Sequence, residues 1–221
     1  MMCLFLSYRP LSTESATPIV LWWESHAEWL AGIPDLQKYV VHTPGVTRDP
    51  YLEDDDLPAQ VLQLYFSSLD ALEAHLRPGG AVQALLDDRW TMTQQVMLVR
   101  SYVSTETPSA STQATYLVAY HGAALDYSDW LSHYIDHHIP LMRRLPGLRE
   151  LEIYTRVDWA SSLPIPRSHA VQRNKVVFDD SAAMTAALNS PLRHEMRADY
   201  HAFPAFEGAN QHYPMISQQF S

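Results

Sequence analysis

The residues best suited to chemistry lie in the run DYSDWLSHYIDHHIPLMRRLPGL, from Asp126 to Leu148. At the roughly 100° per residue of an α-helix, His138 falls near the middle of the apolar stripe, and Tyr134 lies one turn earlier on the same stripe. Burial in an apolar cavity disfavours the charged form of an imidazole, which leaves it neutral and able to act as a general base. We therefore predict His138 as a catalytic acid/base, with the Tyr134 hydroxyl donating a hydrogen bond to a substrate carbonyl or enolate.

The same periodicity is compatible with a purely structural role. A histidine on an apolar helix face can be a core residue bonded to a backbone carbonyl, and a tyrosine beside it can simply fill the core. Both alternatives are open for His138 and Tyr134.

Seven further residues are predicted to contact a ligand. Tyr120 and His121 end a predicted strand, where alternation lets only one of the two face inward. The others lie on the helix of His138, late in the last helix, or at the place in the first half that matches His138. The set is His121, Tyr120, Trp130, Leu131, Met142, His201 and His26.

A metal site is not predicted. His133 and His137 stand at i and i+4 on one helix face, but no H-E-x-x-H pattern and no cysteine pair supplies further ligands. Only seven glycines are present and none forms a phosphate-binding loop before a helix, which argues against nucleotide cofactors. We expect no cofactor, and haem is kept as an alternative.

The helix that carries His138 has recognisable ends. Asp126 is a candidate N-cap, and Pro146-Gly147 is a stop signal. Pro140 lacks the N–H that would bond to the Asp136 carbonyl, so a kink is expected beside His138.

An internal repeat sets the organisation of the chain. Leu4 aligns with Tyr116, Ile33 with Leu145 and Phe66 with Phe178, each at the same offset of 112 residues. Three windows that agree without a gap indicate two copies of one unit. The predicted boundaries are residues 1–104 for the first unit and 113–221 for the second, joined by the linker-like run STETPSAST.

Each unit reads strand, helix, strand, strand, helix, strand. We predict strands at Cys3 to Tyr8, Leu36 to Thr43, Gln60 to Phe66, Gln95 to Val103, Thr115 to Tyr120, Leu148 to Arg156, Asn174 to Phe178 and His212 to Ser217, with helices at Pro18 to Ala31, Ser68 to Leu86, Tyr127 to Leu145 and Asp180 to Phe203. A βαββαβ unit places both helices on one face of an antiparallel sheet and leaves the other face bare. The predicted fold class is therefore α+β, with two tandem ferredoxin-like units that pair their sheets into a barrel, as a pseudo-dimer.

The second half resembles the EthD-like branch of the dimeric α+β barrel superfamily. The likeness is carried by the strand YLVAYH, the run Tyr134-x-x-x-His138-x-Pro140-Leu141 and the Leu145-Pro146-Gly147-Leu148 turn. It implies a ligand cavity between sheet and helices. Relatives in the superfamily include cofactor-free cyclases and dehydratases, muconolactone isomerases, quinone-forming monooxygenases and some haem proteins. The first half resembles the family only through the repeat, with His26 aligned to His138.

Composition excludes several classes of function. The net charge of −10 argues against nucleic acid or an anionic membrane as partner. The apolar opening MMCLFLSY is too short for a membrane span and lacks a basic n-region, so it is predicted to be a strand rather than a signal peptide. A single cysteine, Cys3, forms no internal disulfide, which favours a cytoplasmic location.

The resulting expectation is an enzyme of an aromatic or polyketide catabolic or biosynthetic pathway, acting on a small, largely apolar aromatic or polyketide-like molecule. Cofactor-independent lyase or isomerase chemistry, namely dehydration, cyclisation or isomerisation, is the leading interpretation. A cofactor-free or haem-dependent monooxygenase is the second, and a non-catalytic ligand-binding accessory protein is the third. The chain is expected to be a monomeric pseudo-dimer or a homodimer of it.

Overall fold

Alternating apolar residues along the strands build a closed antiparallel barrel. The computed structural model describes residues 1–11, 20–52, 57–105 and 111–221, with backbone alone for residues 20–25. The start of the first predicted helix and the interior of the predicted linker lie outside these ranges. The strands of the described residues are β1 (Met2–Pro10), β2 (Leu36–Pro44), β3 (Gln60–Phe66), β4 (Trp90–Ser104), β5 (Thr112–Ala124), β6 (Leu148–Arg156), β7 (Ala170–Phe178) and β8 (Phe206–Phe220).

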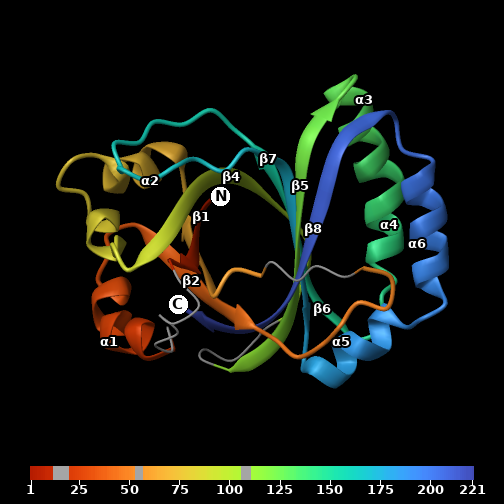
Figure 1. Cartoon of the computed structure of the whole chain (residues 1–221), viewed down its shortest axis with the longest axis horizontal. Helices are drawn as coiled ribbons and strands as arrows, with labels where there is room; N and C mark the ends of the chain where they lie inside the picture. The colour runs from red at the N-terminus through yellow and green to blue at the C-terminus, as the bar shows by residue number, and fades with distance from the viewer. Residues whose placement is uncertain (12–19, 53–56, 106–110) are drawn as a thin grey trace.

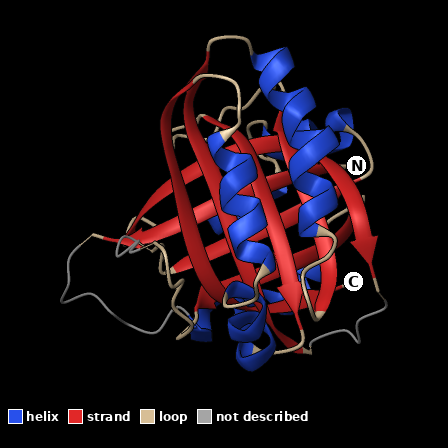
Figure 2. Ribbon diagram, turned by 90° about the vertical axis from the view of Figure 1, so that its right-hand side faces the viewer, coloured by secondary structure: helices blue, strands red, loops and turns tan. Residues whose placement is uncertain are grey.

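The helical segments cover the outside of the barrel. The first half contributes α1 (Val20–Ala31), α2 (Leu69–Leu76) and the short 3₁₀ segment η1 (Ala81–Leu85). The second half contributes α3 (Tyr127–His133), the π-helical turn η2 (Tyr134–His138), α4 (Ile139–Met142), α5 (Ser181–Leu188) and α6 (Leu192–His201). Figure 1 shows α1 and α2 at one end of the molecule and α3 to α6 at the other. Figure 2 shows the second group lying across the outer face of the strands.

The two halves contribute their strands in the same spatial order. Around the barrel the order is β1-β3-β2-β8-β5-β7-β6-β4, so the first half reads β4-β1-β3-β2 and the second β8-β5-β7-β6. The halves meet at two antiparallel seams, where Tyr39 on β2 pairs with Phe220 on β8, and Met97 on β4 pairs with Arg156 on β6. The predicted α+β class with paired antiparallel sheets is thereby confirmed.

Alternation along each strand separates two environments. On β5, Tyr116, Val118 and Tyr120 face the helices of the second half, while Leu117 faces the barrel interior. One apolar core therefore lies under each group of helices, and a third fills part of the barrel.

Buried charges cross the barrel interior and tie the halves together. Lys175 on β7 is 1% exposed and lies 2.9 Å from Glu152 and 3.0 Å from Glu150. Its ammonium also donates to the Tyr65 hydroxyl of the first half, at 3.0 Å. Burial alone would raise the pKa of Glu152, but Lys175 and Lys38 hold that pKa well below its usual range. The Lys175 ion pairs join β6 and β7 of the second half, and Lys38 on β2, 3.3 Å from Glu152, adds an ion pair between the halves.

Three predicted helices differ from the observed ones. The helix predicted from Ser68 to Leu86 ends at Leu76. Pro78 disfavours the helical backbone conformation at the residue before it, and Gly79 adopts a φ of 77° that no α-helix contains. The helix predicted from Asp180 to Phe203 is divided into α5 and α6, and at the break the Ser190 hydroxyl donates to the Ala187 carbonyl at 2.7 Å. The helix predicted from Tyr127 to Leu145 contains the π-helical turn.

The long loops between the second and third strands of each half cross to the opposite half. Leu163, from the loop before β7, is buried in the core under α1 and α2, and the Ser162 N–H donates to the Leu76 carbonyl. In return, Asp49 from the loop after β2 pairs with Arg193 on α6. Figure 1 shows both crossings, the first segment passing α2 and the second running toward α5.

The turn before the second strand of each half needs the same unusual backbone. Gly147 has a φ of 72°, and Asp35, at the matching position of the repeat, has a φ of 61°. Such positive φ values are comfortable for glycine and strained for most other residues. Within the described ranges, no helix is long and apolar enough to cross a membrane.

Candidate active site

The π-helical turn places His138 against the sheet. The Asp126 carboxylate caps α3 by accepting from the Asp129 N–H at 3.0 Å, as predicted. Pro140 cannot donate, and the Ile139 N–H reaches back five residues to the Tyr134 carbonyl, so the predicted kink takes the form of a π-turn. His138 is 6% exposed, whereas its neighbour His137 is exposed.

His138 forms a dyad with Asp199 of α6. The two side chains meet at 2.7 Å between Nδ1 and Oδ2. The other oxygen of Asp199 lies 3.1 Å from Nε2 of His133. Because the carboxylate accepts, the proton of neutral His138 is placed on Nδ1, which leaves Nε2 as a proton acceptor.

The environment of His138 favours its neutral form. Burial lowers the pKa of this imidazole below its ordinary value, and Asp199 opposes that effect only in part. Arg193 lowers the pKa further by charge repulsion. A neutral imidazole with a free Nε2 is the form that a general base requires at neutral pH.

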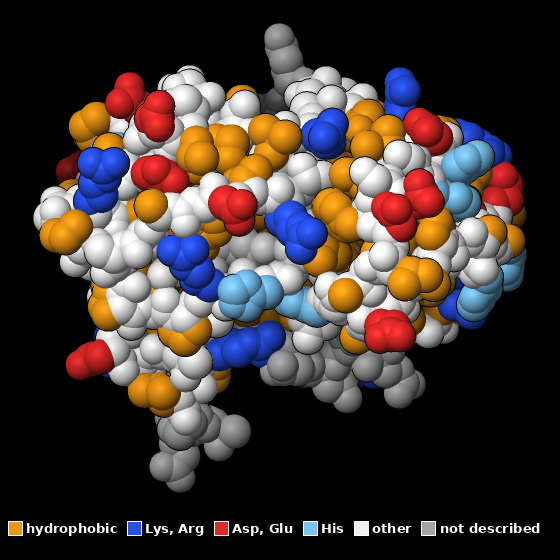
Figure 3. All heavy atoms as spheres, turned by 90° about the horizontal axis from the view of Figure 1, so that it is seen from above, with side chains coloured by type: hydrophobic (Ala, Val, Ile, Leu, Met, Phe, Trp, Pro, Cys, Tyr) orange, Lys and Arg blue, Asp and Glu red, His pale blue; other side chains and the backbone are white. Residues whose placement is uncertain are grey.

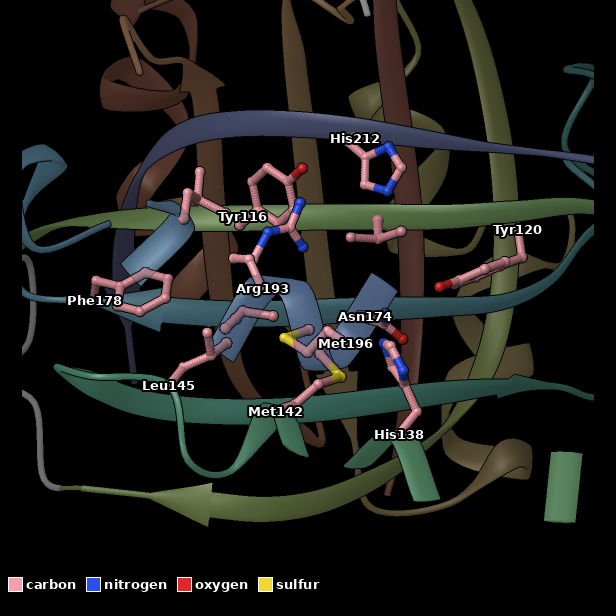
Figure 4. Close-up of a pocket in the computed structure, with 13 residues that line it drawn as sticks. Tyr116, Tyr120, His138, Met142, Leu145, Asn174, Phe178, Arg193, Met196 and His212 are labelled. Atoms are coloured by element: carbon pink, nitrogen blue, oxygen red, sulfur yellow. The ribbon is translucent and has the colours of Figure 1, made fainter. Parts of the chain in front are cut away.

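Two adjoining cavities lie between the sheet and the helices, and His138 lines both. The inner cavity has a volume of about 50 Å³ and is mostly apolar; its wall consists of Tyr116, Val118, Tyr120, His138, Met142, Leu145, Asn174, Val176, Phe178, Leu188, Arg193, Met196 and His212. Figure 4 shows these side chains converging from β5, β7, β8 and the helices. The outer cavity has a volume of about 130 Å³ and is lined by Leu52, Tyr120, His138, Arg193, Met196, Arg197, Tyr200, His201, Asn210 and His212.

The size of the cavities limits the ligand. An apolar cavity of about 150 Å³ holds benzene. The outer cavity alone is close to that size, and the inner one adds space for a substituent or a second ring edge. The space suits a molecule of one or two rings.

Polar groups from three elements meet at the end of the inner cavity. The Tyr116 hydroxyl on β5 donates to Asp49 Oδ2 at 2.5 Å, and Arg193 Nη2 donates to the same oxygen at 2.7 Å. The Tyr116 ring stacks on His212 of β8 with centroids 5.6 Å apart. The apolar cavity therefore has an imidazole in one wall and a guanidinium in another.

Four of the predicted site residues line these cavities. His138, Tyr120 and Met142 line the inner one, and His201 lines the outer one. His121 points to the other side of β5, where Arg173 contributes to a lowered pKa whose main cause is burial. Alternation therefore gives the cavity position to Tyr120.

The remaining predicted residues lie outside the cavity walls. Trp130 is buried in an aromatic cluster, stacked on Phe206 at 5.4 Å, and Leu131 packs against the same core. The Tyr134 hydroxyl accepts from Asn174 at 2.6 Å and lies behind the residues that line the cavity. His26 belongs to α1 in the first half.

Several site residues were missed in the sequence. Asn174 stands out as a polar residue within the buried strand AVQRNKVVF, which is a usable signal. Asp199 and Arg193 look like ordinary surface charges on a helix, and Asp49 lies in a loop 144 residues before Arg193, with which it pairs.

The exposed histidines of the second-half helices are His137, His194 and His201, and Figure 3 shows histidines gathered at that end of the molecule.

Neither a metal nor haem finds a prepared site. Within the described part of the chain, no group of three or more His, Cys, Asp or Glu side chains is arranged to hold a metal ion. His138 Nε2 is a suitable donor for haem iron, but the cavities of about 50 and 130 Å³ fall below the roughly 300–1,000 Å³ of typical ligand and cofactor pockets. Haem does not fit this arrangement.

Solved structures with a similar fold cover the whole chain. A protein described as anthrone oxidase-like has a TM-score of 0.66 at 13% identity, covering 99% of this chain and 92% of its own. A protein from Fusobacterium nucleatum, named for a proposed monooxygenase activity, has a TM-score of 0.59 at 9% identity, covering 100% and 93%. One from Lactobacillus acidophilus, named likewise, has a TM-score of 0.56 at 10% identity, covering 100% and 96%.

These likenesses place the chain in the dimeric α+β barrel fold, at identities that speak for the fold alone. No family model and no curated protein matches the sequence.

Proposed function

We propose that this protein is a cofactor-independent oxygenase acting on a small aromatic carbon acid. The observation that carries the proposal is the His138–Asp199 dyad, whose imidazole lines an apolar inner cavity and a larger, more polar outer cavity, together of one- to two-ring size. The names of the similar structures favour oxygenation over the dehydration or isomerisation expected from the sequence.

The reaction begins with proton abstraction. His138 Nε2 takes a proton from a CH₂ group made acidic by a conjugated carbonyl, and the resulting carbanion attacks O₂ to form a C–O bond. The imidazolium returns the proton to the peroxide oxygen, and loss of water from the hydroperoxide leaves a new carbonyl. In balance, CH₂ and O₂ give C=O and H₂O, and oxygen is the only oxidant.

Two other interpretations share this site. A dehydratase, cyclase or isomerase would use the same proton abstraction and differ only in the fate of the carbanion. An accessory protein would bind the molecule without abstracting the proton. Membership of the EthD-like family belongs to the same proposal and rests on the sequence run from Tyr134 to Leu148.

The proposed partner is a small aromatic molecule, with neither nucleic acid nor membrane involved. The cytoplasmic location remains a prediction based on the single cysteine, Cys3.

The test separates proton abstraction from oxygen use. Aromatic ketones with an activated CH₂ are incubated in D₂O without oxygen, and C–H exchange is followed by NMR; oxygen uptake is then measured in air. Exchange together with oxygen uptake supports the proposal. Exchange without uptake transfers the protein to the isomerase class, and binding without exchange overturns catalysis altogether.

Variants at matched positions of the repeat sharpen this test. His138→Ala is expected to slow exchange by about 10²- to 10⁴-fold, because it removes the general base. His26→Ala, at the equivalent place in the first half, is expected to leave exchange unchanged. Equal losses in both variants would exclude His138 as the base.

A further inference from the structure

Arg193 has a donor that the protein itself does not use. The residue lies in the first turn of α6 and lines both cavities. Its side chain is 11% exposed, and Nη2 is bound to Asp49. Nε is buried and has no hydrogen-bond partner among the described residues. Figure 4 shows the guanidinium extending from α6 beside Tyr116.

The Asp49 carboxylate fixes this guanidinium and is itself saturated. Its side chain is 2% exposed. Oδ1 accepts from the Tyr51 N–H at 2.8 Å, while Oδ2 accepts from Tyr116 and Arg193. Three donors leave Asp49 little capacity for a ligand, and they hold the planar guanidinium in one orientation.

A buried N–H without a partner is costly, and in native proteins it usually serves a ligand or water. A structural tie between Arg193 and Asp49 requires only Nη2 and gives no reason to leave Nε unpaired. The arrangement therefore places a cationic donor and a neutral base, His138, in the walls of one apolar cavity. Bases of this kind work best when a second group stabilises the charge that proton removal creates.

We propose that Arg193 Nε binds the substrate oxygen on which negative charge develops when His138 removes a proton. The inference rests on the proposed function and narrows its substrate class to aryl ketones whose acidic C–H is conjugated to that oxygen. The apolar side chains of the same cavity, including Val118, Val176 and Phe178, receive the ring.

Other ionisable groups around the cavities are accounted for in the test. His138, His212, Tyr116 and Tyr120 share the inner wall with Arg193, with Asp49 behind Tyr116. The outer wall adds Arg197, Tyr200 and His201, and Asp199 lies behind His138. Arg144 is the control, because it is an exposed cation that pairs with Glu195 of the same helix and lines neither cavity.

The experiment uses 4-nitrophenol, whose ionised form is yellow, as a probe that needs no turnover. Binding to the whole protein is followed by absorbance across a pH series. In the wild type, the bound probe is expected to ionise at lower pH than the free probe. Arg193→Gln is expected to lower the acid ionisation constant of the bound probe by about 10- to 100-fold, so that the probe ionises at higher pH. This change corresponds to the loss of one charged hydrogen bond.

Two further variants fix the direction of the effect. Arg144→Gln is expected to change the constant by less than about threefold, since an exposed charge is screened by solvent. Asp49→Asn is expected to strengthen the ionisation of the probe, because it removes the neutralising carboxylate while its amide oxygen still accepts from Nη2. A purely structural Arg193 would not produce this opposite shift.

The proposal is overturned if Arg193→Gln and Arg144→Gln have equal effects, or if Asp49→Asn weakens ionisation of the bound probe. If Arg193→Gln does not fold, the proposal is tested with Asp49→Asn and with Arg193→Lys. The lysine variant keeps the charge but loses Nε. If probe ionisation depends on Arg193 but no oxygen uptake is found, the proposed oxygenase function is refuted and the Arg193 site is supported. If oxygen uptake is found but probe ionisation does not depend on Arg193, the Arg193 site is refuted and the oxygenase function is supported.

Discussion

Replacing Asp199 by Asn is the most informative change to the candidate base. The carboxylate offers Oδ2 to His138 at 2.7 Å and Oδ1 to His133 at 3.1 Å. An asparagine of the same shape has one acceptor oxygen, so only one of the two histidines can still donate to it. His138 then either loses its partner or accepts from the amide, which moves its proton to Nε2.

The size of the effect follows from the lost interaction. Asp199 counteracts the lowering of the His138 pKa that burial causes. Loss of this charged hydrogen bond, worth about 1.5–3 kcal/mol, lowers that pKa further. A weaker base in the wrong tautomer is expected to slow proton abstraction by about 10²- to 10⁴-fold.

The pH dependence has a defined sign. Only neutral His138 accepts a proton, so the rate rises as pH increases through the lowered pKa of this residue. In Asp199→Asn this rise is expected at lower pH, with a lower maximum. Nitrogen-15 NMR of the imidazole measures both the tautomer and the pKa directly, independently of any substrate.

The control is Glu195→Gln on the same helix, an exposed carboxylate paired with Arg144 at 2.9 Å. It is expected to leave the His138 tautomer and pKa unchanged. The reasoning is refuted if Asp199→Asn retains the Nδ1–H tautomer and an unchanged pKa, or if Glu195→Gln shifts them as strongly.

Three stability predictions follow from buried or strained residues. Burial lowers the pKa of His42 from 6.5 to about 3, so at acidic pH the unfolded chain binds a proton that the folded chain does not. The free energy of unfolding should therefore fall by about 3–5 kcal/mol as the pH drops through this window. Urea unfolding at pH 7 and pH 4 should show this fall in the wild type and not in His42→Gln, and an equal fall in both proteins would refute the prediction. Asp35→Gly should raise the melting temperature by about 1–3 °C, because it relieves a φ of 61°, whereas Gly147→Ala should lower it; a calorimetric scan decides. Lys175→Met should cost about 3–5 kcal/mol in denaturant unfolding, because it leaves Glu152 buried without its nearest cation, and a loss below about 1 kcal/mol would contradict this.

Local sequence signals predicted the elements and the burial of His138 well. Strand alternation located all eight strands of the described residues, since one face of each must be apolar, although β4 begins five residues and β8 six residues before the predicted start. The Asp126 cap and the turn at Gly147 were readable for the same reason, because they depend on neighbouring residues alone. Asp35, at the matching turn of the first half, keeps a similar backbone without being glycine.

The partners of His138 could not be read in this way. Asp199 lies on α6, 61 residues after His138, and the direction in which its side chain points depends on the break between α5 and α6. The π-turn adds a residue to one turn and rotates all that follows, so a regular helical wheel loses phase there. Trp130 packs in an aromatic cluster with Tyr127 and Phe206. Helical periodicity cannot distinguish a residue in such a cluster from one that lines a cavity.

The seam between β2 and β8 has a consequence for synthesis of the chain. Its pairs join Tyr39 to Phe220, which are 181 residues apart. While the ribosome makes the chain, this edge of β2 stays unpaired until β8 has emerged. Contacts this distant in sequence form slowly, and open strand edges recruit other strands in the meantime. A nascent chain is therefore exposed to aggregation until β8 is available, and deletion of β8 should lower soluble yield more than an equal deletion in a surface loop.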